Sequence, residues 1–111
     1  MNKRKLFIEE LPFAAADALD RLGQRVSAAR RQRRWTQADL AAKSQTGLTT
    51  VAEIERGSPS VQIGHWMKVL WALDQTDLFV KFADPATDET GVARMLADLP
   101  KKVRHSRGGQ R

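Results

Sequence analysis

The stretch TQADLAAKSQTGLTTVAEIERG, residues 36–57, predicts two short helices joined by a tight turn. Thr36 is expected to cap the first helix, because Asp39 follows three residues later in the spacing of a capping box. The turn is expected at residues 44–47, and Gly57 is expected to end the second helix in a left-handed conformation. Four apolar side chains should turn inward from the two helices: Leu40, Ala41, Val51 and Ile54.

The outer face of the second predicted helix bears mainly small polar and uncharged side chains. Its expected members are Leu48, Thr49, Ala52 and Glu53. Two short helices with such a face are typical of a helix-turn-helix, in which the second helix enters the major groove of DNA. The pattern therefore predicts double-stranded DNA as a binding partner.

A longer helix is predicted before this motif, from Pro12 or Phe13 to about Arg33. Pro12 suits the first helical turn, because the N–H that it lacks would have no helical partner there. Gly23 weakens the middle of this stretch, which leaves open a start nearer Asp20 or a division into two segments. An apolar stripe at helical spacing supports the helix: Leu19, Leu22, Val26 and Ala29.

The motif is followed by Ser-Pro-Ser at residues 58–60, which is expected to form a loop and to cap a helix ending near Leu73. Trp71 of this helix is assigned to the core, with a dimer or partner contact as the alternative. Trp35 is expected to pack as a hydrophobic staple before the motif, and His65 is expected to be exposed. The buried face of the helix should consist of Trp66, Val69, Leu70 and Leu73. These elements predict an all-α fold, a small helical bundle that contains the helix-turn-helix.

The C-terminal part of the chain is expected to form a short extension of this bundle. Residues 76–82 predict a short helix capped by Thr76, although their alternating apolar side chains also allow a strand. We favour the helix, because an exposed single strand would need a partner chain to pair its edge. A last helix is expected from residues 84–85 to Pro100, with apolar Val92, Met95, Leu96 and Leu99.

The net charge of +6 is unevenly distributed along the chain. Residues 21–34 carry six arginines and no acidic residue, and residues 100–111 carry five basic residues and no acidic one. Residues 35–99 carry nine acidic and five basic residues. Two basic blocks around an acidic body suit a polyanion such as nucleic acid. We therefore divide the chain into an N-terminal arm (1–12), a helix-turn-helix DNA-binding domain (13–75), a C-terminal extension for dimer or partner contact (76–100) and a basic disordered tail (101–111).

The composition argues against several other classes of protein. The chain has no cysteine and only two histidines, far apart in sequence, so we expect no metal site. It has no nucleophile–base pair and no glycine-rich phosphate loop, so we expect no catalytic residue and no cofactor. No apolar run approaches the length of a membrane span, and the N-terminus lacks a signal peptide, so we expect a cytoplasmic protein without membrane contact.

Two segments of the sequence resemble known regulators. The strings TQADLA and VAEIERG resemble the phage-repressor-like (Cro/C1, or XRE) helix-turn-helix family. The resemblance covers about residues 20–73 and implies a lambda-repressor-like DNA-binding domain. The string LWALDQTDLFVKFADPATDETGVARMLADLPKKVR resembles the tails of HipB-type regulators. This second resemblance implies an antitoxin that binds a HipA-like kinase toxin and represses its own operon, as a homodimer on a palindromic operator. A plain phage-type repressor and a protein-interaction module with only generic DNA binding are the alternatives.

The resemblance also implies roles for particular residues. Gln37 would lie beside the DNA backbone, and Thr50 would reach a phosphate or pack locally. Arg56 and Ser60 would bind phosphates, together with Arg33 or Arg34. Three outward residues would face base edges: Leu48, Thr49 and Glu53. Gly47, just before them, would also belong to the DNA-binding surface. Gln45 and Gly47 depart from the family pattern in the turn, where Gln45 takes the place of glycine and Gly47 that of a serine or threonine cap.

Two further groups of residues complete the implied site. Arg30 and Glu55 would form an internal ion pair between the first and third helices of the domain. The basic charge of the tail favours an arm on DNA or on a protein partner, with a solvated terminus as the third interpretation. The residues of this arm would be Lys101, Lys102, Arg104 and Arg107. Deletion of the tail should flatten the salt dependence of DNA binding if the tail is a DNA arm.

Overall fold

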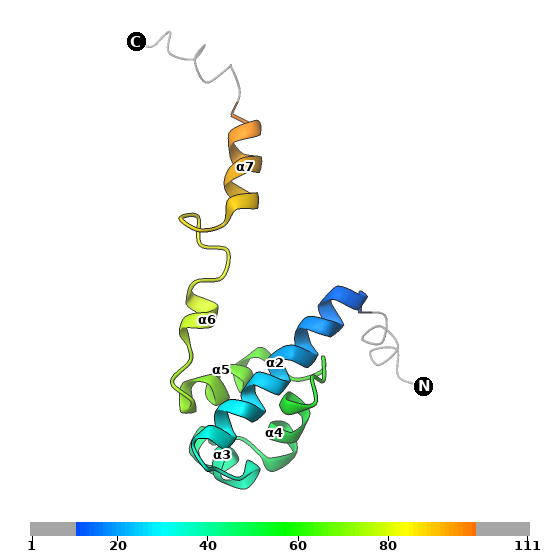
Figure 1. Cartoon of the computed structure of the whole chain (residues 1–111), viewed down its shortest axis with the longest axis vertical. Helices are drawn as coiled ribbons and strands as arrows, with labels where there is room; N and C mark the ends of the chain where they lie inside the picture. Colours follow the sequence, from blue (N-terminus) through cyan, green and yellow to red (C-terminus); the bar gives the residue numbers. More distant parts are fainter. Residues whose placement is uncertain (1–10, 100–111) are drawn as a thin grey trace. The chain divides into compact units, whose positions relative to one another are not determined.

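A computed structural model describes residues 11–99, which fold entirely as helices and turns, as the predicted all-α class requires (Figure 1). The chain divides after Thr76 into two compact units. The tail at residues 101–111 and most of the arm at residues 1–12 lie outside the described residues. The helices are α2 (Phe13–Gln32), α3 (Gln37–Ser44), α4 (Leu48–Glu55), α5 (Ile63–Ala72), α6 (Asp77–Val80) and α7 (Glu89–Ala97).

Helix α2 is continuous through Gly23, so the division into two segments that the sequence allowed does not occur. A Cβ atom at Gly23 would lie 2.5 Å from the carbonyl oxygen of Ile54 and 2.6 Å from that of Glu55. The glycine is therefore the point at which the backbone of α2 approaches the last turn of α4. Its helical cost, about 1 kcal/mol relative to alanine, is offset by this close packing.

The two helices of the motif begin and end as their local sequence predicts. The Thr36 hydroxyl accepts a hydrogen bond from the backbone N–H of Asp39 at 3.0 Å, and the Asp39 carboxylate accepts one from the N–H of Thr36 at 2.8 Å. These bonds hold the pKa of Asp39 below its ordinary value. Gln45 adopts the left-handed conformation, with φ 58° and ψ 41°, and so does Gly57, with φ 78°.

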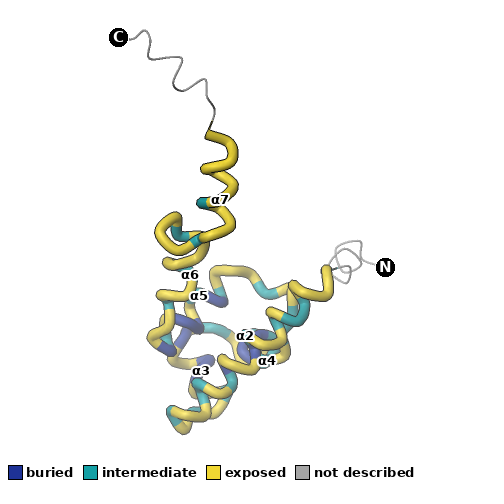
Figure 2. The backbone as a smooth tube through the Cα atoms, turned by 45° about the horizontal axis from the view of Figure 1, so that its top comes forward, coloured by how far each residue is buried: buried dark blue, intermediate teal, exposed yellow. Residues whose placement is uncertain are grey.

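The hydrophobic core lies where α2, α3, α4 and α5 meet (Figure 2). The four inward residues predicted for the motif are buried, as is the predicted inner face of α5. Trp66 is only 5% exposed, but Trp71 is 63% exposed, so its assignment to the core is wrong. Trp71 lies five positions after Trp66, and the buried face of α5 instead continues through Val69, Leu70 and Leu73.

The start of α5 also differs from the prediction. The helix begins at Ile63 with Gln62 at the N-cap, and Ser60 does not cap it. The hydroxyls of Ser58 and Ser60 instead hydrogen-bond to each other at 2.9 Å, and the N–H of Ser60 donates to Ser58 at 3.3 Å. This local turn extends the loop before the helix starts.

The second unit is described only to Leu99, and none of its residues from Asp77 onward is buried. Helix α6 is a single turn, as favoured over the strand. Helix α7 begins at Glu89, later than the predicted residues 84–85, because Asp84 accepts a hydrogen bond from the N–H of Ala86 at 2.9 Å and forms a turn. Asp88 then caps α7 through the N–H of Gly91 at 3.0 Å.

Candidate nucleic-acid interface

The outer face of α4 is held outward by the packing of its inner face. Val51 and Ile54 are fully buried, which fixes the rotation of the helix. Leu48, the first residue of α4, is 53% exposed, and Thr49 beside it is exposed as well. Three further predicted residues on or beside this face are half-buried: Thr50, Ala52 and Glu53. Gly47 is the N-cap of α4 and supplies no side-chain acceptor, so the first amides of the helix remain without a side-chain cap within the described chain.

The first turn of α3 lies close to the end of α4. Gln37 is the first residue of α3, and its Nε2 atom donates a hydrogen bond to Oε1 of Glu55 at 2.9 Å. An amide nitrogen carries two hydrogens, so one donor of Gln37 is left for a further acceptor. The side chain expected beside the DNA backbone is thus oriented by a carboxylate of α4.

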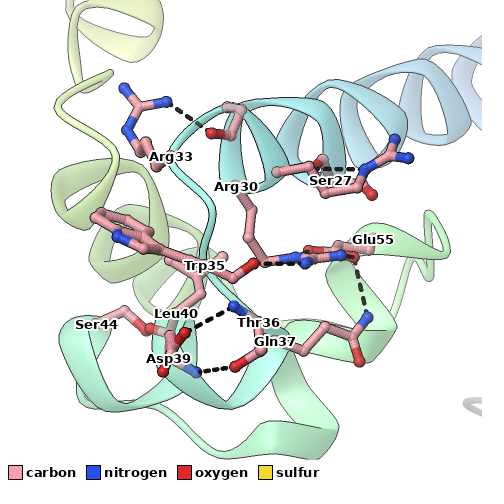
Figure 3. A network of polar contacts seen from close by, with 12 residues as sticks. Ser27, Arg30, Arg33, Trp35, Thr36, Gln37, Asp39, Leu40, Ser44 and Glu55 are labelled. Atoms are coloured by element: carbon pink, nitrogen blue, oxygen red, sulfur yellow. Dashed lines mark hydrogen bonds and ion pairs between the residues drawn. The ribbon is translucent and has the colours of Figure 1, made fainter.

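That carboxylate also pairs with Arg30 of α2 (Figure 3). Nε of Arg30 donates to Oε2 of Glu55 at 2.7 Å, and a terminal nitrogen donates to Oε1 at 3.1 Å. The other terminal nitrogen donates to the carbonyl oxygen of Trp35 at 2.8 Å. The two side chains are only 13% and 8% exposed. One bidentate pair thereby links α2, the segment before α3, and α4, while Gln37 adds the first turn of α3.

The charges of this pair are mutually stabilised. Burial by itself would raise the pKa of Glu55, but the hydrogen bonds from Arg30, Gln37 and Ser27 and the positive charge of Arg30 outweigh burial and lower it. The hydrogen bond to Glu55 raises the pKa of Arg30 in turn. Both groups are therefore ionised at neutral pH, so Gln37 donates its hydrogen bond to a charged carboxylate.

A hollow of about 340 Å³ lies beside the network and is called here the interhelical hollow. Its lining comes from α2, α3, α4 and the C-cap residue of α4: Gln24, Ser27, Arg31, Gln37, Ala52, Glu55 and Arg56. Arg31 and Arg56 are both exposed, and Nε of Arg31 donates to the carbonyl oxygen of Ser27 at 3.3 Å. A guanidinium has five donors, so both arginines keep several for a phosphate.

Gln24, Ser27 and Arg31 were not among the site residues expected from the sequence. They recur three and four residues apart on α2, and this polar stripe was the signal available for finding them. Only the packing of α2 against α4 shows that the stripe borders the motif.

Arg33, which the sequence offered as a phosphate contact, has internal partners instead. Its guanidinium donates to the carbonyl oxygens of Ala29, at 2.8 Å, and Leu73, at 2.9 Å. It also lies 5.8 Å from the ring centre of Trp35, whose other neighbour is the Lys43 ammonium at 4.8 Å. Arg33 thus joins the end of α2 to the end of α5.

The remaining predicted phosphate contacts are on the surface. Arg56 follows α4 as its C-cap and is exposed, and Ser60 is exposed in the loop before α5. Gln37, Arg56 and Arg31 are brought together at the interhelical hollow, whereas Ser60 is not among its lining residues. The four residues predicted for a basic arm lie outside the described residues: Lys101, Lys102, Arg104 and Arg107.

Comparison with known proteins agrees with this geometry. Residues 26–76, which include α3, α4 and α5, match the model of the helix-turn-helix family. The match covers just under half of the chain and supports a helix-turn-helix DNA-binding domain in this segment. No curated protein and no solved structure matches the chain. Between residues 11 and 99, no helix is both long and apolar enough to cross a membrane.

Proposed function

We propose that this protein is a sequence-specific transcriptional repressor that binds a palindromic operator as a homodimer. The observation that supports the proposal best is the outer face of α4, with Leu48 and Thr49 exposed, beside the interhelical hollow. A face of this kind suits the base edges of the major groove, and guanidinium groups beside it suit the flanking phosphates.

The chemistry of the α4 face predicts what it would recognise. Leu48 suits a thymine methyl group, Thr49 a polar edge or a methyl group, and Glu53 the amino group of cytosine. The α4 face has no arginine, asparagine or glutamine for a bidentate contact with a purine. Phosphate contacts should therefore supply much of the affinity, through Arg31, Arg56, Gln37 and Ser60, and the affinity should fall steeply with salt.

The C-terminal resemblance extends the proposal to a particular system. The protein would be the antitoxin of a HipA-like kinase and would repress the operon that encodes both proteins. The second unit offers apolar surface for a protein partner, because several of its large side chains are exposed: Leu78, Val80, Phe82, Met95, Leu96 and Leu99. A plain phage-type repressor would use the same α4 face without such a partner.

Fluorescence anisotropy of the full chain tests the DNA-binding proposal. The duplex upstream of its own gene is compared with a scrambled duplex at roughly 50 and 200 mM salt. A preference of about 10³-fold or more for the upstream duplex is expected of a specific regulator. Equal, salt-sensitive binding to both duplexes would contradict the repressor and favour a protein-interaction module with generic DNA affinity.

The antitoxin proposal has its own test. If a HipA-like kinase is encoded beside this gene, the two purified proteins should form a stable complex in size-exclusion chromatography, and the kinase should lose autophosphorylation activity. A kinase that elutes separately would contradict the antitoxin role and leave the repressor proposal standing.

A further inference from the structure

The outward face of α5 bears a row of large apolar side chains that the domain core does not use. Ile63 and Trp71 are 61% and 63% exposed, and Met67 between them is half-buried. The three residues are spaced four apart, so they form one stripe along the helix, which is called here the α5 stripe. Trp66, Val69 and Leu70 of the same helix are buried, and the exposed side chains of Ile63 and Trp71 lie beside this buried face.

The α5 stripe is complementary to a reversed copy of itself. Its pattern is centred on Met67, so a second α5 in antiparallel orientation would place Trp71 of each copy against Ile63 of the other. Gly64 adjoins Ile63, and a Cβ atom there would have no neighbour within 4 Å. This open space leaves room for the indole ring of Trp71 from the second copy.

The charges at the ends of α5 suit the same antiparallel arrangement. Within the described chain, no side chain caps the N-terminus of α5, and its first turn has no acidic residue. Asp74 is exposed immediately after the C-cap Leu73. Antiparallel pairing would bring the carboxylate of Asp74 from each copy to the uncapped amides of the other, where a negative charge is favourable.

We infer that the α5 stripe binds the same stripe of a second copy, antiparallel across a two-fold axis at Met67. The inference rests on the proposed homodimeric function and names the contact through which the dimer forms. An isologous contact of this kind uses one patch on both subunits. Three side chains per copy cover less than the ~800 Å² per partner of a standard interface. The dimer is therefore weak in free solution, and joint binding to one palindromic DNA strengthens it.

Disulfide cross-linking of the full chain tests the antiparallel contact directly, because the natural sequence has no cysteine. The Met67→Cys variant should form a covalent dimer on mild oxidation, since residues on the axis meet their own copies within the ~7 Å Cα separation that a disulfide allows. Gln24→Cys, exposed on α2, is the matched control. A mixture of Ile63→Cys and Trp71→Cys chains should cross-link more than either variant alone. Cross-linking of Met67→Cys no greater than that of Gln24→Cys would overturn the inference.

Sedimentation and DNA binding provide a second test. Trp71→Ala should weaken self-association at least tenfold and lower affinity for a palindromic duplex, with little change on a single half-site. Phe82→Ala is the control, because Phe82 is a 77% exposed aromatic residue in the second unit. Loss of association in Phe82→Ala and not in Trp71→Ala would overturn the inference. Cross-linking through α5 without operator preference would instead contradict the proposed repressor function and retain the α5 contact.

Discussion

Replacement of Arg30 by alanine should destabilise the domain more than replacement of any exposed arginine. Arg30→Ala removes both hydrogen bonds to Glu55 and the bond to the Trp35 carbonyl oxygen. It leaves a carboxylate that is only 8% exposed without its cation. Breaking a buried pair in this way costs about 3–5 kcal/mol. Glu55 keeps the hydrogen bond from Gln37, so we expect a loss near the lower limit, about 3 kcal/mol.

Thermal unfolding followed by circular dichroism measures this loss. For a domain of this size, about 3 kcal/mol corresponds to a fall in Tm of roughly 10–20 °C. Arg21→Ala is the matched control, because Arg21 is also paired on α2, with Asp17 at 2.7 Å, but its side chain is 72% exposed. That variant should change stability by less than about 1 kcal/mol. A Tm for Arg30→Ala equal to that of Arg21→Ala would refute the reasoning.

The same variant predicts a pH dependence of defined sign. The fold lowers the pKa of Glu55 below its ordinary value of 4.5, so the pair stabilises the protein fully above pH 4.5. That stability is lost as the pH falls through the lowered pKa, because a protonated Glu55 no longer needs a cation. The difference in unfolding free energy between wild type and Arg30→Ala should therefore shrink in acid. A difference that stays constant from pH 7 to about pH 3 would mean that Arg30 stabilises the domain by packing and not by charge.

Five other substitutions test the fold and the phosphate contacts. In urea unfolding at low protein concentration, Gly23→Ala should destabilise the domain by about 1–3 kcal/mol, because the new Cβ would overlap carbonyl oxygens of α4. Gly64→Ala is the control, and it should be neutral or slightly stabilising because Gly64 has open space around it. Thr36→Ala removes the capping box of α3 and should cost about 1 kcal/mol in the same assay, and a loss below about 0.3 kcal/mol would show that packing alone positions α3. Arg31→Ala should reduce the salt slope of DNA binding by about one phosphate contact without lowering the Tm. Arg33→Ala should lower the Tm, because it loses two internal hydrogen bonds. The reverse result would contradict the assignment of Arg31 to phosphate and of Arg33 to the interior.

Features that depend on near neighbours follow from the amino-acid sequence alone. The capping box of Thr36 and Asp39 links residues three apart, and the left-handed Gly57 ends α4 through local backbone geometry. The inward positions of α4 follow from helical periodicity, which any stretch of helix imposes on its own side chains. These local rules were sufficient for the all-α class, for the motif and for the outward face of α4.

Features that join distant parts of the chain depend on how whole helices pack against one another. Arg30 and Glu55 are 25 residues apart and Arg33 and Leu73 are 40 apart, so helical periodicity alone does not show that they meet. The resemblance suggested the first of these pairs, whereas the second, the hydrogen bond from Gln37 and the close approach at Gly23 came from the packing of whole helices. Trp71 is exposed for the same reason, since periodicity places it on a face and only the neighbouring helices determine which face the core covers.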